Sequence, residues 1–250
     1  MGLIILDINN ILNTFEKSLY TWPLMILLNI VFLVVAFRNR SKEKWTRLFI
    51  VYGIAALLQG FLTGFLSFAK KILFKDTPTL TLANEYSIII FILIELIIFY
   101  TLFYFLFSQK RVKNMILITG KIFGVTSGLI SLCIFFFASP TTLTLFEGYL
   151  SVTASILLLI PSFYYFYTLF TTPPDKNLLY EPFFWIITGI AFINSLNIPV
   201  FLLYNFFIKE YTLYSINYAA YCILFILFII SLLCNKKQKS VSTRLNYYTH

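Results

Sequence analysis

The stretch IIIFILIELIIFY, residues 88–100, decides how the chain folds. It is apolar except for Glu95, and no other charged residue lies between Glu85 and Lys110. A transmembrane helix needs about 20 mostly apolar residues, and this stretch reaches that length with its apolar flanks. A carboxyl group in the middle of such a span is costly and usually faces the interior of a helix bundle. The stretch therefore predicts a membrane span in which Glu95 has polar neighbours.

The composition of the whole chain also favours a membrane protein. The 250 residues are 60% hydrophobic and 12% charged, and the mean hydropathy is +0.86; soluble domains carry about 25% charged residues. Seven apolar runs can span a bilayer, and they cover residues 19–37, 47–69, 86–107, 115–137, 149–170, 183–207 and 212–233. We predict an all-α fold: a polytopic bundle of seven transmembrane helices in one domain, residues 1–234, followed by a basic, mobile cytoplasmic tail at 235–250.

Lysine and arginine residues predict the orientation of the bundle. Thirteen of the 19 fall in the first, third and fifth loops and the C-terminal tail, and five fall at the N-terminus and in the other loops. Because cytoplasmic loops carry the excess of positive charge, we expect the N-terminus outside and the C-terminus in the cytoplasm. The same loop clusters account for the net charge of +9. The lipid bilayer is therefore the expected partner, and nucleic acid is not.

Glycines recur on one face of two predicted spans. They are Gly53, Gly60 and Gly64 in the second span and Gly120, Gly124 and Gly128 in the fourth. Small residues at this spacing let two helix backbones approach closely in lipid, so we interpret them as helix-packing residues within the bundle. A homodimer seam is the alternative interpretation. Lys121 is expected to extend toward the cytoplasmic headgroups, and a pairing of Lys121 with Glu95 is a second hypothesis.

Polar residues from four other spans fall at about the depth of Glu95. With a rise of about 1.5 Å per residue, they are Asn29, Gln59, Asn194, Asn197, Tyr218 and Tyr221. If these side chains point inward, they form an enclosed polar site with Glu95, which we predict to bind a ligand. The alternative is that each makes an ordinary interhelical hydrogen bond, worth about 0.6 kcal/mol.

The sequence lacks recognisable catalytic and metal-binding motifs. Its one histidine is His250, and its cysteines, Cys133, Cys222 and Cys234, form no CxxC pair. We therefore expect no enzyme activity, no metal site and no cofactor. Two function classes stay open. One is a receptor that binds a small molecule around Glu95 and engages a cytoplasmic or membrane signalling partner; the other is a transporter of a small solute or proton, in which Glu95 titrates.

The second half of the chain resembles a known family. It contains PSFYYFYTLF, then LLYEPFFWIITGIAF, then YCILFILFIISLLCNKK. The pattern is similar to that of an uncharacterised family of small seven-helix integral membrane proteins of Bacteroidota-type bacteria. The residues that carry the resemblance are Tyr165, Phe166, Tyr167, Pro182, Phe184, Trp185, Ile186, Gly189, Cys234 and Lys236. The resemblance implies the fold and a multi-pass location in the bacterial inner membrane, and it carries over no catalytic residue.

A more distant likeness belongs to the transporter alternative. SWEET-type sugar transporters have an outside N-terminus and a repeat of three plus one plus three helices. Pro23 in the first span and Pro161 in the fifth are similar in placement to such a repeat.

Overall fold

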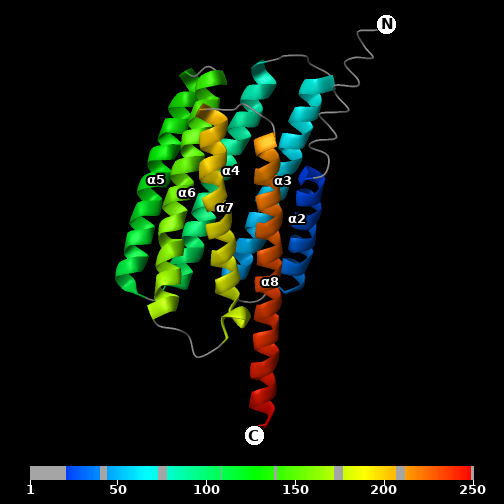
Figure 1. Cartoon of the computed structure of the whole chain (residues 1–250), viewed down its shortest axis with the longest axis vertical. Coiled ribbons are helices and arrows are strands. Elements are labelled where there is room, and N and C mark those ends of the chain that lie inside the picture. The colour runs from blue at the N-terminus through cyan, green and yellow to red at the C-terminus, as the bar shows by residue number, and fades with distance from the viewer. Residues whose placement is uncertain are drawn as a thin grey trace.

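The protein is helical throughout the part of the chain that the structure describes, residues 21–39, 44–72, 78–107, 109–137, 140–171, 177–206 and 212–248 (Figure 1). This computed structural model contains α2 (Thr21–Arg38), α3 (Lys44–Ile72), α4 (Pro78–Leu106), α5 (Lys110–Phe137), α6 (Pro140–Thr171), a short 3₁₀ helix η1 (Leu178–Tyr180), α7 (Pro182–Phe206) and α8 (Thr212–Tyr248). Helices α3 to α8 are long and apolar enough to cross a membrane, and α2 contributes the shorter apolar helix Trp22–Arg38. The predicted all-α, seven-helix fold is confirmed, and the orientation of its termini stays a prediction.

Several helices begin earlier or end later than the apolar runs predict. α4, α6 and α7 each begin at a proline, which is favoured in the first turn because it has no N–H group to leave unpaired. α6 begins at Pro140, so Glu147 lies inside the helix and not in a loop before it. α8 continues to Tyr248, so residues 235–248, predicted as a separate tail, extend the last helix.

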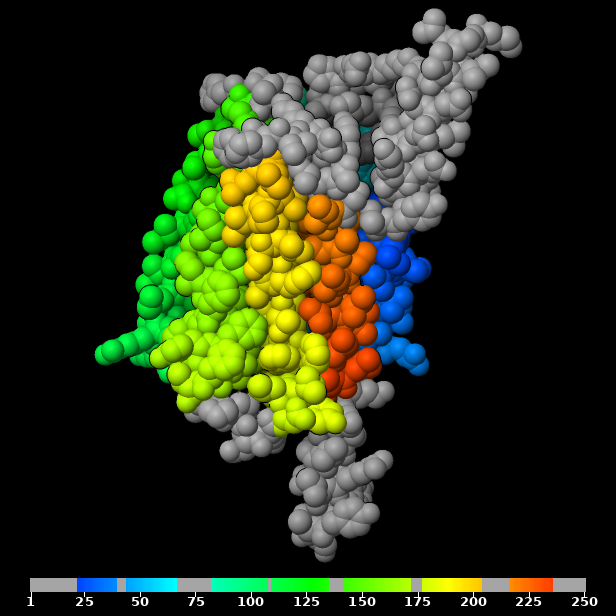
Figure 2. All heavy atoms as spheres, viewed as in Figure 1, coloured from blue at the N-terminus to red at the C-terminus, as the bar shows by residue number. Residues whose placement is uncertain are grey.

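Six helices form a ring, and α5 packs outside it. Neighbours around the ring are α2–α3, α3–α4, α4–α6, α6–α7, α7–α8 and α8–α2, and α5 contacts mainly α4. Within α5, 11% of the span residues are buried, against 56% in α4. Figure 2 shows α5 at one edge of the molecule and α6, α7 and α8 across the facing surface. The ring therefore encloses the interior of the bundle, and α5 presents most of its apolar surface outward.

The glycines of α3 and α5 face different surroundings. A Cβ at Gly60 would lie 2.5 Å from Ile26 Cδ1 on α2, and one at Gly53 would lie 2.6 Å from Leu33 Cδ2. A Cβ at Gly64 would meet the ring of Trp22, and one at Gly120 would lie 2.9 Å from Tyr100 Cδ1 on α4. By this geometry, α3 packs closely against α2, and a side chain at these positions would require the neighbouring side chains of α2 to shift.

Gly124 and Gly128 differ from these four glycines. No described atom lies within 4 Å of a Cβ at either position. The structure therefore does not pair them with another helix of the same chain, because α5 turns this part of its surface away from the ring. A homodimer seam at this surface stays a prediction.

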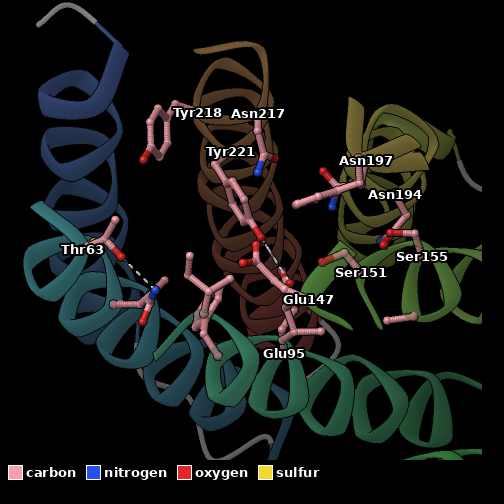
Figure 3. A pocket seen from close by; sticks show the side chains of 18 of the residues that line it. Thr63, Glu95, Glu147, Ser151, Ser155, Asn194, Asn197, Asn217, Tyr218 and Tyr221 are labelled. Atoms are coloured by element: carbon pink, nitrogen blue, oxygen red, sulfur yellow. Dashed lines mark hydrogen bonds between the residues drawn. The ribbon is translucent and has the colours of Figure 1, made fainter. Parts of the chain in front are cut away.

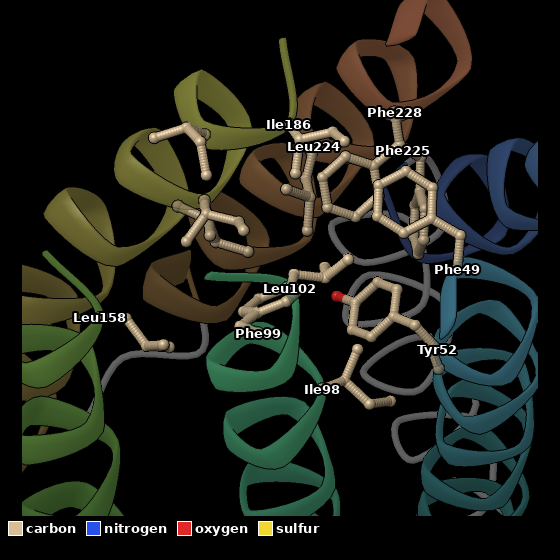
Figure 4. Close-up of a cluster of buried hydrophobic side chains, with 14 of the residues drawn as sticks. Phe49, Tyr52, Ile98, Phe99, Leu102, Leu158, Ile186, Leu224, Phe225 and Phe228 are labelled. Atoms are coloured by element: carbon tan, nitrogen blue, oxygen red, sulfur yellow. The ribbon is translucent and has the colours of Figure 1, made fainter. Parts of the chain in front are cut away.

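Aromatic side chains fill the half of the bundle around the C-terminal end of α2. This aromatic cluster consists of Phe32, Trp45, Phe49, Tyr52, Phe99, Phe225 and Phe228, all of them buried. The rings of Phe49 and Phe228 stack with centroids 4.6 Å apart, and Tyr52 lies 5.1 Å from Phe99 and 5.8 Å from Phe228 (Figure 4). Aromatic pairs at such distances stabilise the fold beyond their burial. This half of the ring is therefore closed by packed side chains.

Candidate functional site

A cavity of about 110 Å³, lined by both polar and apolar side chains, lies inside the ring. All six ring helices line it, and none of its described lining residues comes from α5. Trp22 lies at the start of α2, Thr63 in the second half of α3 and Asn217 near the start of α8, so the cavity occupies the half of the bundle opposite the aromatic cluster. Figure 3 shows polar side chains that point from several helices into this space. A water molecule takes about 30 Å³ of liquid, so the cavity holds about three or four waters or one small molecule.

The structure brings most of the predicted site residues together. Glu95, Gln59, Asn194, Asn197, Tyr218 and Tyr221 all line the cavity. Asn29 is not among the lining residues; it is fully buried, and its amide atoms have no hydrogen-bond partner among the described residues. Its place in the site was inferred from depth alone, and a residue at the right depth faces a cavity only if it also lies on the right face of its helix.

Glu95 lies where the cavity meets the aromatic cluster. Tyr52 Oη donates a hydrogen bond of 3.0 Å to Glu95 Oε1, and Tyr221 Oη donates one of 3.2 Å to Oε2. Glu95 is only 8% exposed, and a buried acceptor left without a donor is costly. The two tyrosines, and not Lys121, are its partners, because Lys121 lies exposed on α5. Both oxygens of this carboxyl group are therefore satisfied within the protein.

Gln59 and Asn194 are tied to nearby groups at the cavity surface. Gln59 Nε2 donates to Thr63 Oγ1 at 2.9 Å, one turn further along α3. Asn194 Nδ2 donates to the carbonyl oxygen of Ile190 at 2.7 Å on its own helix. These bonds fix the direction of the two amides and leave their carbonyl oxygens as acceptors for other groups.

A second acidic residue, Glu147 of α6, also lines the cavity. Glu147 is 2% exposed, and its carboxyl group interacts with that of Glu85 on α4. Tyr218 lies close enough to Glu147 to interact with it electrostatically. Unlike the oxygens of Glu95, Glu147 Oε2 has no hydrogen-bond partner among the described residues. The carboxyl group of Glu147 therefore interacts with Glu85 and leaves one buried oxygen without a partner, whereas both oxygens of Glu95 have one.

Tyr52 and Glu147 were not predicted as site residues, although both leave a signal in the sequence. Tyr52 lies seven residues, or about two turns, before Gln59 and therefore on the same helix face. Glu147 was excluded because the predicted span began at residue 149. Glu147, Ser151 and Ser155 recur at every fourth position, which is the spacing of one polar face of a helix.

The lining determines which ligands suit the cavity. The polar part of the described lining includes two carboxyl groups, three asparagines, a glutamine and no Lys, Arg or His. The larger part of the wall is apolar and is formed by aliphatic side chains and by aromatic rings such as Trp22 and Phe91. No group of three or more His, Cys, Asp or Glu residues that could hold a metal ion occurs in the described ranges. Carboxylates and aromatic faces both attract positive charge. The cavity therefore suits a small molecule or ion that donates hydrogen bonds or carries positive charge.

Comparison of the chain with protein-family models, with curated proteins and with solved structures finds no match in any of the three. The fold and the cavity define the class of protein. It is an integral membrane protein, a bundle of apolar helices around a cavity with both polar and apolar walls.

Proposed function

We propose that the protein is a receptor of the bacterial inner membrane that binds a small polar molecule in the cavity and signals to a separate partner. The observation that carries this proposal is that the cavity occupies only one half of the ring. Six helices line a space in one half of the ring, five of them with polar residues, while the aromatic cluster occupies the other half. A pocket with a closed end suits ligand binding, whereas conduction requires a continuous path. In the orientation predicted from the charged loops, the cavity lies in the outer half of the membrane.

The contacts of Glu95 suggest how ligand binding in the cavity would affect the cytoplasmic end of the bundle. Tyr52 donates to Glu95 at the cavity and packs against Phe228 in the aromatic cluster. Phe228 stacks on Phe49, and Phe49 meets Trp45 edge-on at 5.6 Å. A ligand that hydrogen-bonds to the Glu95 carboxyl group in place of Tyr52 would free the Tyr52 side chain and so change the packing near the start of α3. Such coupling requires that the cluster have two arrangements, and the partner is expected to bind the first and third loops.

A ligand screen tests the receptor proposal. Full-length protein in nanodiscs is heated with panels of small amines, amino acids, sugars and organic acids. A ligand at about 100 times its Kd stabilises by about 2.7 kcal/mol, which raises Tm by roughly 5–10 °C at this chain length. We expect the amines to raise Tm for the native protein and for Glu181→Gln, which lies outside the cavity. Glu95→Gln should abolish the shift, and an undiminished shift in that variant would contradict the proposal.

Transport is the second candidate, and one observation favours it. Carboxyl groups inside a membrane bundle often mark ion or proton pathways, and this cavity contains two. A transporter would need to open the aromatic cluster during its cycle. Liposomes that contain only this protein distinguish the two: the receptor proposal predicts no flux for any panel, and flux that Glu95→Gln abolishes would replace it with transport.

A further inference from the structure

We propose a binding site for an alkali-metal cation in the wall of the cavity formed by α6, α7 and α8, with Glu147 as its charged ligand. This cation site consists of Glu147, Ser151, Asn197 and Asn217. It uses a different carboxyl group from the proposed ligand site at Glu95. The inference therefore goes beyond the receptor proposal and does not depend on it.

Four oxygen atoms in this wall lack a hydrogen-bond partner among the described residues. They are Glu147 Oε2, Ser151 Oγ, Asn197 Oδ1 and Asn217 Oδ1. Glu147 is 2%, Ser151 4% and Asn197 8% exposed, and all four residues line the cavity (Figure 3). Buried polar atoms are nearly always partnered in folded proteins. Four unpartnered oxygens in one wall therefore indicate that the wall binds something.

The chemistry of these atoms favours a hard cation. Carboxylate, amide carbonyl and hydroxyl oxygens are the ligands that hard metal ions prefer. A proton on Glu147 would serve only one of the four oxygens, whereas a metal ion can contact several at once. Glu95 shows the contrast, because the hydroxyl groups of Tyr52 and Tyr221 already serve both of its oxygens.

The balance of charge in the wall favours the same conclusion. Glu147 interacts with Glu85, and the described lining residues include no cationic side chain. A buried carboxylate without a counter-charge is strongly unfavourable. Glu85 Oε2 also lacks a partner among the described residues. Because two adjacent carboxyl groups do not both ionise readily, Glu147 and Glu85 together supply one negative charge, which matches a monovalent ion, since calcium sites usually supply more carboxylates.

The helices place these ligands on three separate elements. Glu147 and Ser151 lie one turn apart on the same face of α6, Asn197 lies on α7 and Asn217 near the start of α8. A bound ion would therefore hold the three helices together at the cavity, and removal of the ion would loosen this side of the ring.

Equilibrium binding of radioactive sodium to the full-length protein in nanodiscs tests the site. Ionic strength is held constant with N-methylglucamine chloride, and sodium, potassium or methylammonium chloride is added as competitor. We expect saturable binding that sodium or potassium displaces. Loss of a residue that only supports a metal ligand typically costs roughly 10–100-fold in affinity, so loss of the charged ligand in Glu147→Gln should weaken binding by more than about 100-fold, and Ser151→Ala should weaken it by about tenfold. Glu181→Gln, outside the cavity, should bind like the native protein.

The outcomes separate the cation site from its alternatives. Absence of saturable sodium binding by the native protein would overturn the site, whether or not Glu147→Gln folds. Unchanged affinity in a folded Ser151→Ala variant would also overturn it. Displacement of the bound sodium by methylammonium at a much lower concentration than by potassium or unlabelled sodium would indicate a site for an organic amine instead. The amine screen with Glu95→Gln is a separate measurement, so the receptor proposal and the cation site can each fail without the other.

Discussion

Replacement of Tyr52 by phenylalanine isolates the hydrogen bond that joins the cavity to the aromatic cluster. The change removes one hydroxyl group, which donates to Glu95 Oε1 at 3.0 Å, and keeps the ring that packs against Phe99 and Phe228. Tyr52 is fully buried. Tyr52 is not among the residues that line the cavity, and without its hydroxyl group Glu95 keeps Tyr221 as its one partner among the described residues.

The size of the effect follows from the type of bond. Interhelical hydrogen bonds in membrane proteins contribute about 0.6 kcal/mol on average and at most about 1.7, and bonds to charged groups lie at about 1.5–3 kcal/mol. For a buried carboxyl group that loses its shorter bond, we expect a loss of about 1.5 kcal/mol. At roughly 2–4 °C per kcal/mol for a chain of this size, Tm should fall by roughly 3–6 °C.

A double-mutant cycle assigns this loss to Glu95. Unfolding free energies are measured by circular dichroism during reversible denaturation in mixed micelles for Tyr52→Phe, Glu95→Gln and the double variant. We expect the cost of Tyr52→Phe to fall by about 1 kcal/mol in the Glu95→Gln background, as is typical for residues in direct contact. Tyr100→Phe serves as the control, because its hydroxyl group donates to the carbonyl oxygen of Leu157 at 3.4 Å. Its effect should be additive with Glu95→Gln within about 0.5 kcal/mol. An equal cost of Tyr52→Phe in both backgrounds would refute the reasoning.

Three further predictions concern the aromatic cluster, the glycines and the orientation. Phe228→Ala removes a fully buried, stacked ring and should reduce the unfolding free energy by about 3–5 kcal/mol. The control, Phe170→Ala, removes an 86% exposed ring and should change the unfolding free energy little. Similar losses in the two variants would mean that the aromatic cluster is not packed. Gly60→Leu, which forces a side chain against Ile26, should cost about 1–3 kcal/mol in the same denaturation assay, and Gly124→Leu should cost far less because its surroundings are open. A fluorescent protein fused to the C-terminus should fluoresce, and alkaline phosphatase fused there should be inactive, because these two results indicate a C-terminus in the cytoplasm. The reverse pattern would place the cavity in the inner half of the membrane.

The seven helices could be predicted because the bilayer sets their minimum length. A span of about 20 apolar residues stands out in any sequence, and each predicted run lies largely within one helix of the structure. The boundaries were less predictable where a helix continues through polar residues. Glu147 lies in such an extension of α6, and residues 235–248 form another in α8.

The depth of the site residues in the membrane was predictable from the sequence, but the direction of their side chains around the helix axis was not. Counting residues along the helices placed Gln59, Asn197 and Tyr221 at the height of Glu95, and all of them line the cavity. The same count included Asn29, which does not line it, because depth does not specify the angle around the helix axis. The position of α5 outside the ring depends on which helices pair, and this is a property of contacts distant in the sequence.

Hydroxyl-radical footprinting in nanodiscs tests the central claim most directly, because it oxidises aromatic side chains that lie beside water. Two tryptophans form a matched pair: Trp22 lines the cavity, and Trp45 belongs to the aromatic cluster. The cavity is large and polar enough to hold water, so we predict rapid oxidation of Trp22 and Tyr221 and protection of Trp45. Equal protection of Trp22, Tyr221 and Trp45 would mean that no hydrated cavity exists around Glu95, and equal oxidation of all three would mean that water passes through the closed half of the ring.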